Sequence, residues 1–168
     1  VLPPDINSSQ TGFMIEKFSE KDIPAKSKGI LYKKSAIRFG FSAIKNVGKA
    51  AIDAILSERE ENGSFKSLDD FVKRVNLRTV NRKTMESLIK AGAMDAFGKR
   101  NAMLKVLDDI KASGVSLSKT ISTGQASLFA ENEIEEKNSV SASVDLVLNT
   151  TEEAPREEIL SWERELLG

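Results

Sequence analysis

The feature that most constrains the fold is a series of four helical patterns between residues 43 and 112. Apolar residues recur in them at the spacing of one helix face. Ser or Asn begins two of the patterns and Gly follows three, as helix caps do. The expected helices are 49–61, a short helix opening at 67, a helix from 81 to 90 and one from about 100 to 112. They can share one small helical core.

Residues 1–42 have a different pattern. Phe13 to Glu16 and Ala36 to Phe41 place β-branched or aromatic residues at alternate positions, which is typical of strands. The stretch between them is rich in Lys and contains Pro24 and Gly29 as breakers. We therefore expect a small antiparallel β unit, and a chain whose fold class is mainly α.

The balance of basic and acidic residues also differs between the two ends of the chain. The 25 basic and 25 acidic side chains cancel, but residues 1–112 hold 21 basic and 14 acidic ones. Residues 113–155 are rich in Ser and Thr and contain one aromatic residue, Phe129. Such a segment buries too little apolar area to offset roughly 1–2 kcal/mol of backbone entropy per ordered residue. We expect a disordered acidic linker there.

A last helix is expected over residues 156–168, because Pro155 precedes an amphipathic pattern. Its apolar stripe of Ile159, Trp162 and Leu166 implies a docking partner, for which the next domain of a longer protein is one candidate.

Composition excludes several functions. The chain has no His and no Cys, which removes Cys/His zinc sites, Ser-His-Asp triads and disulfide frameworks. No metal, cofactor or catalytic residue is expected. No apolar run is long enough to cross a membrane, and the N-terminus lacks the pattern of a signal peptide. We expect a piece of a longer cytoplasmic protein with no membrane partner.

The most informative stretch is Ile44 to Ile55, which has the helix-hairpin-helix pattern of a small-apolar-Gly turn followed by a helix. Backbone N–H groups at the start of such a helix can hold a DNA phosphate, and flanking lysines release counterions from the duplex. Asn46 stands where the motif usually has Gly, but Asn tolerates the left-handed conformation better than most residues. The candidate DNA-binding residues are Lys45, Asn46, Val47, Gly48 and Lys49. The alternative is an ordinary corner between two helices.

A second, weaker candidate is the turn at Gly98, Lys99 and Arg100. Cations are electrostatically misplaced at a helix N-terminus, and an anionic partner would correct this. A solvated turn is an equal alternative. The stretch is not a phosphate-binding P-loop, because the glycine spacing is wrong and Arg100 replaces the required Ser or Thr.

A third motif stands alone in the polar linker: Gln125, Ala126, Ser127, Leu128 and Phe129. Two adjacent large apolar side chains can fill a pocket on a partner while Gln fixes the register. Because folding on binding costs entropy, the affinity should be about micromolar. Packing of Leu128 and Phe129 back onto the same chain is the alternative.

Together these stretches resemble the alpha subunits of the C-family bacterial replicative polymerases (DNA polymerase III). Order and spacing agree over about residues 1–130 and again at the end, whereas the acidic linker is unmatched. The matching stretches are 1–7, 37–48, 65–71, 80–83, 88–95, 125–129 and 162–168.

The resemblance implies a role for each part of the chain. Residues 1–42 would end the fingers region, 43–112 would be a tandem helix-hairpin-helix module on duplex DNA, and 113–155 would carry the peptide for the beta sliding clamp from Gln125 to Phe129. Residues 156–168 would lead to the next domain. Nucleotidyl transfer by the DNA-directed DNA polymerase would belong to upstream residues. An architectural scaffold between fingers and C-terminal domains, without DNA contact, is the competing hypothesis.

Overall fold

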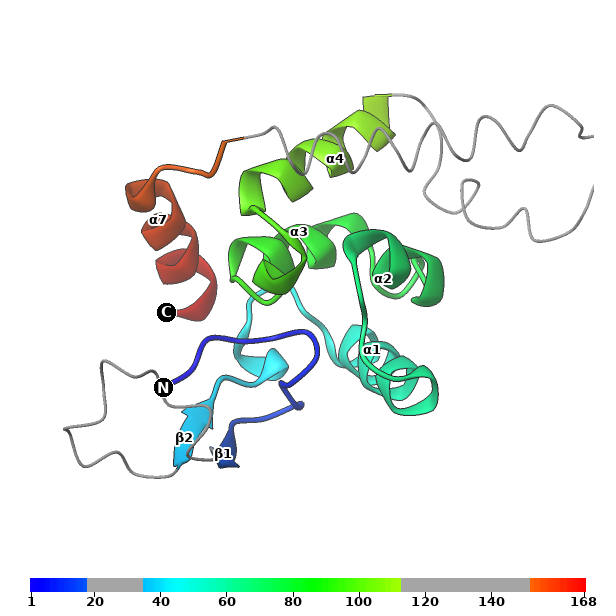
Figure 1. The fold of residues 1–168 in the computed structure, drawn as a ribbon, viewed down its shortest axis with the longest axis vertical. Helices are drawn as coiled ribbons and strands as arrows, with labels where there is room; N and C mark the ends of the chain where they lie inside the picture. The colour runs from blue at the N-terminus through cyan, green and yellow to red at the C-terminus, as the bar shows by residue number, and fades with distance from the viewer. Residues whose placement is uncertain (18–34, 113–151) are drawn as a thin grey trace, which may run out of the picture.

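The computed structural model describes residues 1–17, 35–112 and 152–168. In these ranges, helices pack around one core and a two-stranded sheet lies at one edge, near the N-terminus (Figure 1). The predicted fold class, mainly α with a small N-terminal β unit, is confirmed. The elements are β1 (Met14–Lys17), β2 (Ser35–Arg38), η3 (Phe41–Ala43), α1 (Lys49–Asn62), α2 (Leu68–Arg74), α3 (Arg82–Lys90), η4 (Asp95–Phe97), α4 (Arg100–Ala112) and α7 (Arg156–Leu167).

The sheet is the antiparallel unit that the alternating patterns predict. β1 and β2 pair with Ile15 opposite Ile37 and Glu16 opposite Ala36. Leu2 extends the unit on its other side, since its N–H donates to the carbonyl of Ile37 at 2.7 Å and its carbonyl accepts from the N–H of Phe39 at 3.1 Å. A short sheet is marginal alone, so this third segment adds support that the strand patterns do not indicate.

The helical core follows the expected apolar faces. Met85, Leu88 and Ile89 on α3 are fully buried, and α3 packs against both α4 and α7. Burial of these faces is the main favourable contribution to folding. Other large side chains that are fully buried in the same core come from the remaining elements: Ile6, Phe41, Ile52, Ile55, Phe71, Met103 and Leu107.

Two of the predicted helix caps form as expected. The Ser67 hydroxyl accepts from the N–H of Asp70 at 3.1 Å, and the Asn81 side chain accepts from the N–H of Thr84 at 3.1 Å. The return bond of the expected capping box is displaced by one residue, because the Asp70 carboxylate accepts from the N–H of Lys66 at 2.9 Å. An Asp side chain thus still satisfies an N-terminal donor beside α2.

The N-terminal segment is fixed to α1 through Arg59. The Arg59 guanidinium donates to the carbonyls of Ile6 at 3.1 Å and Ser9 at 2.8 Å. Burial lowers the pKa of Arg59, and the charge of Asp5 partly offsets this. Ile6 also donates its N–H to the carbonyl of Ala93 at 2.7 Å, which joins this segment to the loop after α3.

The apolar stripe of α7 lies against the same chain. Leu166 is buried in the common core, and α7 packs on α3. Part of the stripe therefore docks on the helical module of the same chain, whereas Ile159 and Trp162 stay partly exposed. The expected acidic linker, apart from residues 152–155, lies outside the described residues.

Within the described ranges, no helix is both long and apolar enough to span a membrane. The same residues contain no group of acidic side chains arranged to hold a metal ion.

Candidate nucleic-acid interface

The candidate turn lies between η3 and α1, and its residues are either buried or exposed. Ile44 and Val47 are buried in the core, whereas Lys45, Asn46, Gly48 and Lys49 are exposed. The side chain of Val47 therefore fixes the turn to the core and is not on the surface. Its neighbours present both lysines and the backbone of Gly48 to solvent.

Asn46 has the left-handed conformation that its place in the motif requires, with φ of 66°. Its carbonyl accepts from the Thr84 hydroxyl at 3.1 Å, and its side-chain amide donates to the Ser87 hydroxyl at 3.2 Å. These bonds hold the turn against the first two turns of α3. They also offset part of the strain of a non-glycine residue with positive φ.

Thr84 and Ser87 support the site but lie outside the helix-hairpin-helix pattern, so the pattern does not indicate them. Both are buried polar residues on a helix face that is otherwise apolar. That pattern is a usable signal, because a buried hydroxyl is almost always bonded to a specific partner.

The start of α1 is open to an anion. Gly48 is the N-cap and has no side-chain oxygen, so no side chain satisfies the first N–H groups of the helix. The helices α2 and α3 differ, since Ser67 and Asn81 cap them. A Cβ added at Gly48 would meet no atom within 4 Å, so the space above the turn is unfilled.

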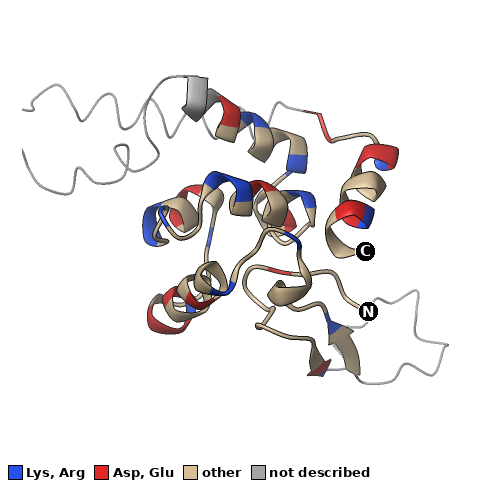
Figure 2. Ribbon diagram, turned by 180° about the vertical axis from the view of Figure 1, so that it is seen from behind, with Lys and Arg blue, Asp and Glu red and all other residues tan. Residues whose placement is uncertain are grey.

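The charges on α1 oppose the helix dipole. Its first turn contains Lys49 and no acidic residue, whereas its last turns contain Glu58, Glu60 and Glu61 together with one basic residue, Arg59. Figure 2 shows this separation, with acidic residues gathered toward the far end of α1. An isolated helix would be more stable with the opposite arrangement, so the Lys49 end suits an external anion better than it suits the helix.

The second candidate turn has a different character, because Arg100 points inward. Arg100 is 6 % exposed, and its guanidinium makes two 2.8 Å bonds to the Asp95 carboxylate and one of 3.0 Å to the carbonyl of Lys90. Glu163 on α7 pairs with it at 2.9 Å. Burial lowers the pKa of Arg100, but the hydrogen bonds and charges of Asp95 and Glu163 outweigh it and raise the pKa overall.

The anion that the sequence predicts beside Arg100 is thus provided by Asp95 and Glu163. Arg100 is buried and paired within the chain, so it is not placed for an external phosphate, contrary to what its position at a helix start suggests. Lys99 is exposed, and Gly98 is half-buried with φ of 145°. The turn holds α4 against α3 and α7.

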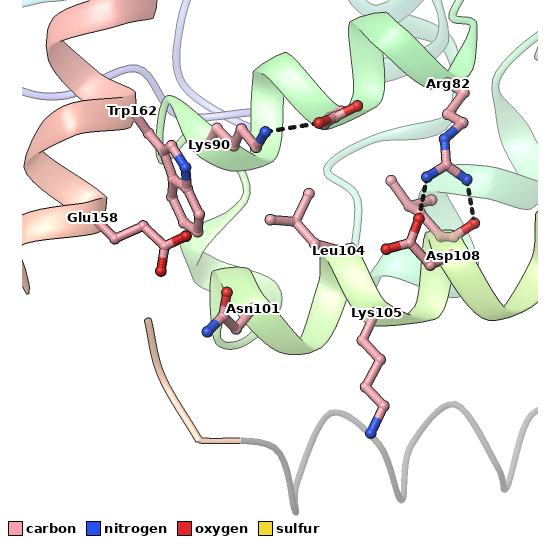
Figure 3. A pocket seen from close by; sticks show the side chains of 10 residues that line it. Arg82, Lys90, Asn101, Leu104, Lys105, Asp108, Glu158 and Trp162 are labelled. Atoms are coloured by element: carbon pink, nitrogen blue, oxygen red, sulfur yellow. Dashed lines mark hydrogen bonds and ion pairs between the residues drawn. The ribbon is translucent and has the colours of Figure 1, made fainter. Parts of the chain in front are cut away.

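Two further cations near α3 are also paired. Arg82 bonds to the Asp108 carboxylate and to the carbonyl of Leu107, and Lys90 pairs with Glu86 at 2.7 Å (Figure 3). Their charges are largely balanced locally. Among the predicted DNA-binding residues, the structure therefore brings together exposed cations with an uncapped helix start at Lys45 to Lys49.

The candidate clamp-binding residues Gln125, Ala126, Ser127, Leu128 and Phe129 lie outside the described residues. Their role stays a prediction.

Comparison with known proteins agrees with this geometry. A family model described as the helix-hairpin-helix motif matches residues 1–104. The whole chain is 41 % identical over 170 residues to the DNA polymerase III subunit alpha of Thermus aquaticus, of which it covers 12 %. It is 34 % identical to the subunit of the same name from Deinococcus radiodurans and 35 % identical to that of Pasteurella multocida, covering 11 % and 13 % of them. The chain is homologous to these subunits over its full length and spans about an eighth of theirs.

Proposed function

The chain belongs to the helix-hairpin-helix motif family, and on that premise we propose that it binds the phosphate backbone of duplex DNA without reading base sequence. The observation that carries the proposal is the start of α1, where Gly48 leaves the first amides without a side-chain cap and Lys45 and Lys49 flank them. A phosphate would accept from these amides, and the lysines would add attraction that weakens with salt.

The absence of sequence reading follows from the groups involved. Backbone amides and lysine ammonium groups recognise phosphate oxygens, which are the same at every base pair. The short, exposed turn carries no Arg, and its one amide side chain, Asn46, is bonded to Ser87. Indifference to base composition is therefore expected.

The homologues suggest the wider setting, which we also propose. In a longer polymerase subunit, this module would hold duplex DNA during replication, and nucleotidyl transfer would be performed by residues outside this chain. Gln125 to Phe129 would tether the polymerase to the sliding clamp. Support for the tether comes from the residue pattern and from the homology over the full chain.

The DNA-binding proposal is tested by exchanging Lys45 and Lys49 for Glu together. The matched control exchanges Lys17 and Lys105, which are also exposed and lie on β1 and α4, so that both variants lose the same charge. Binding to a labelled duplex is measured by fluorescence anisotropy across a salt series. The turn variant should lose at least about tenfold in affinity and show a shallower salt dependence than the control. Equal losses of DNA affinity in the two variants would mean that overall charge, and not the turn, determines binding.

The tether is tested separately with Leu128→Ala and Phe129→Ala together, titrated against purified sliding clamp. The control is Val144→Ala with Leu146→Ala, which truncates two apolar side chains elsewhere in the same polar stretch of the sequence. Loss of clamp binding in the first variant alone is the expected outcome. Retained binding would show that this peptide is not the tether.

One observation favours the architectural alternative for part of the module. Arg100 joins η4, α3 and α7 through bonds that are internal to the chain. The second turn is thus a scaffold element, and the DNA-binding proposal rests on the first turn.

A further inference from the structure

The turn that would hold phosphate is bonded directly to the last turn of α7. The N–H of Lys45 donates to the carbonyl of Leu166 at 3.1 Å. Leu166 is 4 % exposed and belongs to the core, so its carbonyl is held in place by its own buried side chain. Lys45 thus has its ammonium group in solvent, whereas its backbone amide is hydrogen-bonded to a helix that is distant in the sequence.

Two consecutive residues of α7, Trp162 and Glu163, secure this helix to the module. Glu163 pairs with Arg100 at 2.9 Å, and Arg100 is itself fixed by Asp95. The ring of Trp162 lies under the ammonium of Lys90, with 5.6 Å between the nitrogen and the ring centroid (Figure 3). A cation held over an aromatic ring and an ion pair to a buried guanidinium both favour one orientation of α7.

The opposite side of the turn is held by α3. Thr84 donates to the carbonyl of Asn46, and the Asn46 side chain donates to Ser87. The turn therefore lies between two helices, each bonded to an adjacent residue of it. The α3 contact fixes Asn46 in its left-handed conformation, and the α7 contact fixes the peptide between Ile44 and Lys45.

We propose that α7 is a positioning element for the phosphate-binding turn, with Glu163, Trp162 and Leu166 as positioning residues that set DNA affinity without touching DNA. The inference rests on the proposed DNA-binding function. When α7 is docked, the Lys45 amide is held and the amides at the start of α1 are presented in one geometry. When α7 moves away, the turn loses one of its two supports. By linkage, DNA binding then strengthens the docking of α7 by the same factor.

A charge-neutralising pair of variants in the full 168-residue chain separates positioning from electrostatics. Glu163→Gln and Glu165→Gln each remove one negative charge from α7, but Glu165 is exposed. Charge alone predicts slightly tighter DNA binding for both. Positioning predicts that Glu163→Gln binds about fivefold more weakly than Glu165→Gln, at the lower end of typical coupling between sites. Trp162→Ala combined with Glu163→Ala should have a larger effect in the same direction.

Hydrogen exchange of the Lys45 amide, followed by NMR, gives the local readout. It should be faster in the Glu163 variants, while exchange at Phe71 in α2 stays unchanged, because general destabilisation would affect both amides. Faster exchange at Lys45 with unchanged or tighter DNA binding would overturn the inference. Unchanged exchange of the Lys45 amide in the double variant would also overturn the inference. It would mean that Glu163 and Trp162 do not maintain the hydrogen bond between Lys45 and Leu166. Failure of the unmodified chain to bind DNA would instead reject the proposed function.

Discussion

The side chain of Asn7 takes the place of a neighbouring strand for Phe65. Its amide nitrogen donates to the carbonyl of Phe65 at 2.9 Å, and its amide oxygen accepts from the N–H of Phe65 at 2.8 Å. Both backbone groups of a residue 58 positions away are thus satisfied by one side chain. The bonds join the N-terminal segment to the loop between α1 and α2.

Asn7→Ala should therefore destabilise the chain by about 1–3 kcal/mol, since it leaves two partly buried backbone groups of Phe65 without partners. Urea unfolding followed by circular dichroism measures the change. Gln10→Ala is the control, because Gln10 is an exposed amide in the same segment. Equal stability of the two variants would mean that water replaces the Asn7 bonds at no cost.

Features set by a few neighbouring residues could be predicted from the sequence. The caps at Ser67 and Asn81 depend on a hydroxyl or amide three residues before a free N–H, and Asn is a residue type that tolerates the left-handed conformation found at Asn46. The predicted helices agree with the structure for the same reason, because each has its own apolar periodicity and two of them have their own side-chain caps.

Features that depend on distant partners could not be predicted. Arg100 has the same local sequence signal as an exposed cation at a helix start, and only the positions of Asp95 and Glu163 turn it inward. The docking of α7 and the Asn7 bonds likewise arise from tertiary packing. No local pattern specifies which surface a stripe such as that of Trp162 will contact.

The carboxylate of Asp70 should make stability depend on pH. Its bond from the N–H of Lys66 lowers its pKa, burial opposes this, and Arg74 adds to the lowering. Because the pKa is lower in the folded state, the stabilisation is present above the unfolded value and is lost as the pH falls below about 4.

The free energy of unfolding of the unmodified chain should fall more steeply below about pH 4 than that of Asp70→Asn. The difference between the two curves isolates this group from the other carboxylates. Curves that stay parallel from neutral to acidic pH would show that Asp70 contributes no linkage. Asp69→Asn, whose carboxylate pairs with the exposed Lys73, is a suitable control.

Two substitutions of Asn46 should separate the cost of backbone strain from the cost of a lost hydrogen bond. Asn46→Ala keeps an unfavourable positive φ and loses the bond to Ser87, so it should cost about 2–3 kcal/mol. Asn46→Gly loses the same bond but relieves the strain, and should leave stability nearly unchanged. Thermal or urea unfolding distinguishes them. An Ala variant as stable as the Gly variant would show that the turn relaxes to a different conformation.

Gly92 should be more sensitive than Gly63, although both have similar positive φ, 83° and 78°. A Cβ on Gly92 would clash with an Nη atom of Arg100, whereas a Cβ on Gly63 would meet nothing within 4 Å. Gly63→Ala should therefore cost only the strain of placing a side chain on a glycine-type backbone, with ψ of −177°, which is about 1–3 kcal/mol. Gly92→Ala should cost more, because Arg100 must leave its carboxylates, and the excess in urea unfolding measures that contact. Equal costs would mean that Arg100 moves aside freely.

Substitutions of Gly48 that cap α1 should raise stability and weaken DNA binding. Its φ of −79° and ψ of 160° suit any residue, and a side chain there meets open space. Gly48→Asp and Gly48→Ser should both cap α1 and raise the free energy of unfolding by about 0.5–1 kcal/mol, partly because a glycine is removed from the unfolded chain. Each also places an oxygen where the proposed phosphate would accept the same amides.

The two variants should then differ on DNA, although they are similarly stable. Ser competes with the phosphate only as a neutral acceptor, whereas Asp places a carboxylate beside it and repels it. We expect about threefold weaker binding for Gly48→Ser and at least about tenfold weaker binding for Gly48→Asp, measured by anisotropy at low salt. Because both proteins would be at least as stable as the unmodified chain, unfolding cannot account for the loss. Normal DNA affinity in the Asp variant would show that the amides at the start of α1 do not hold phosphate.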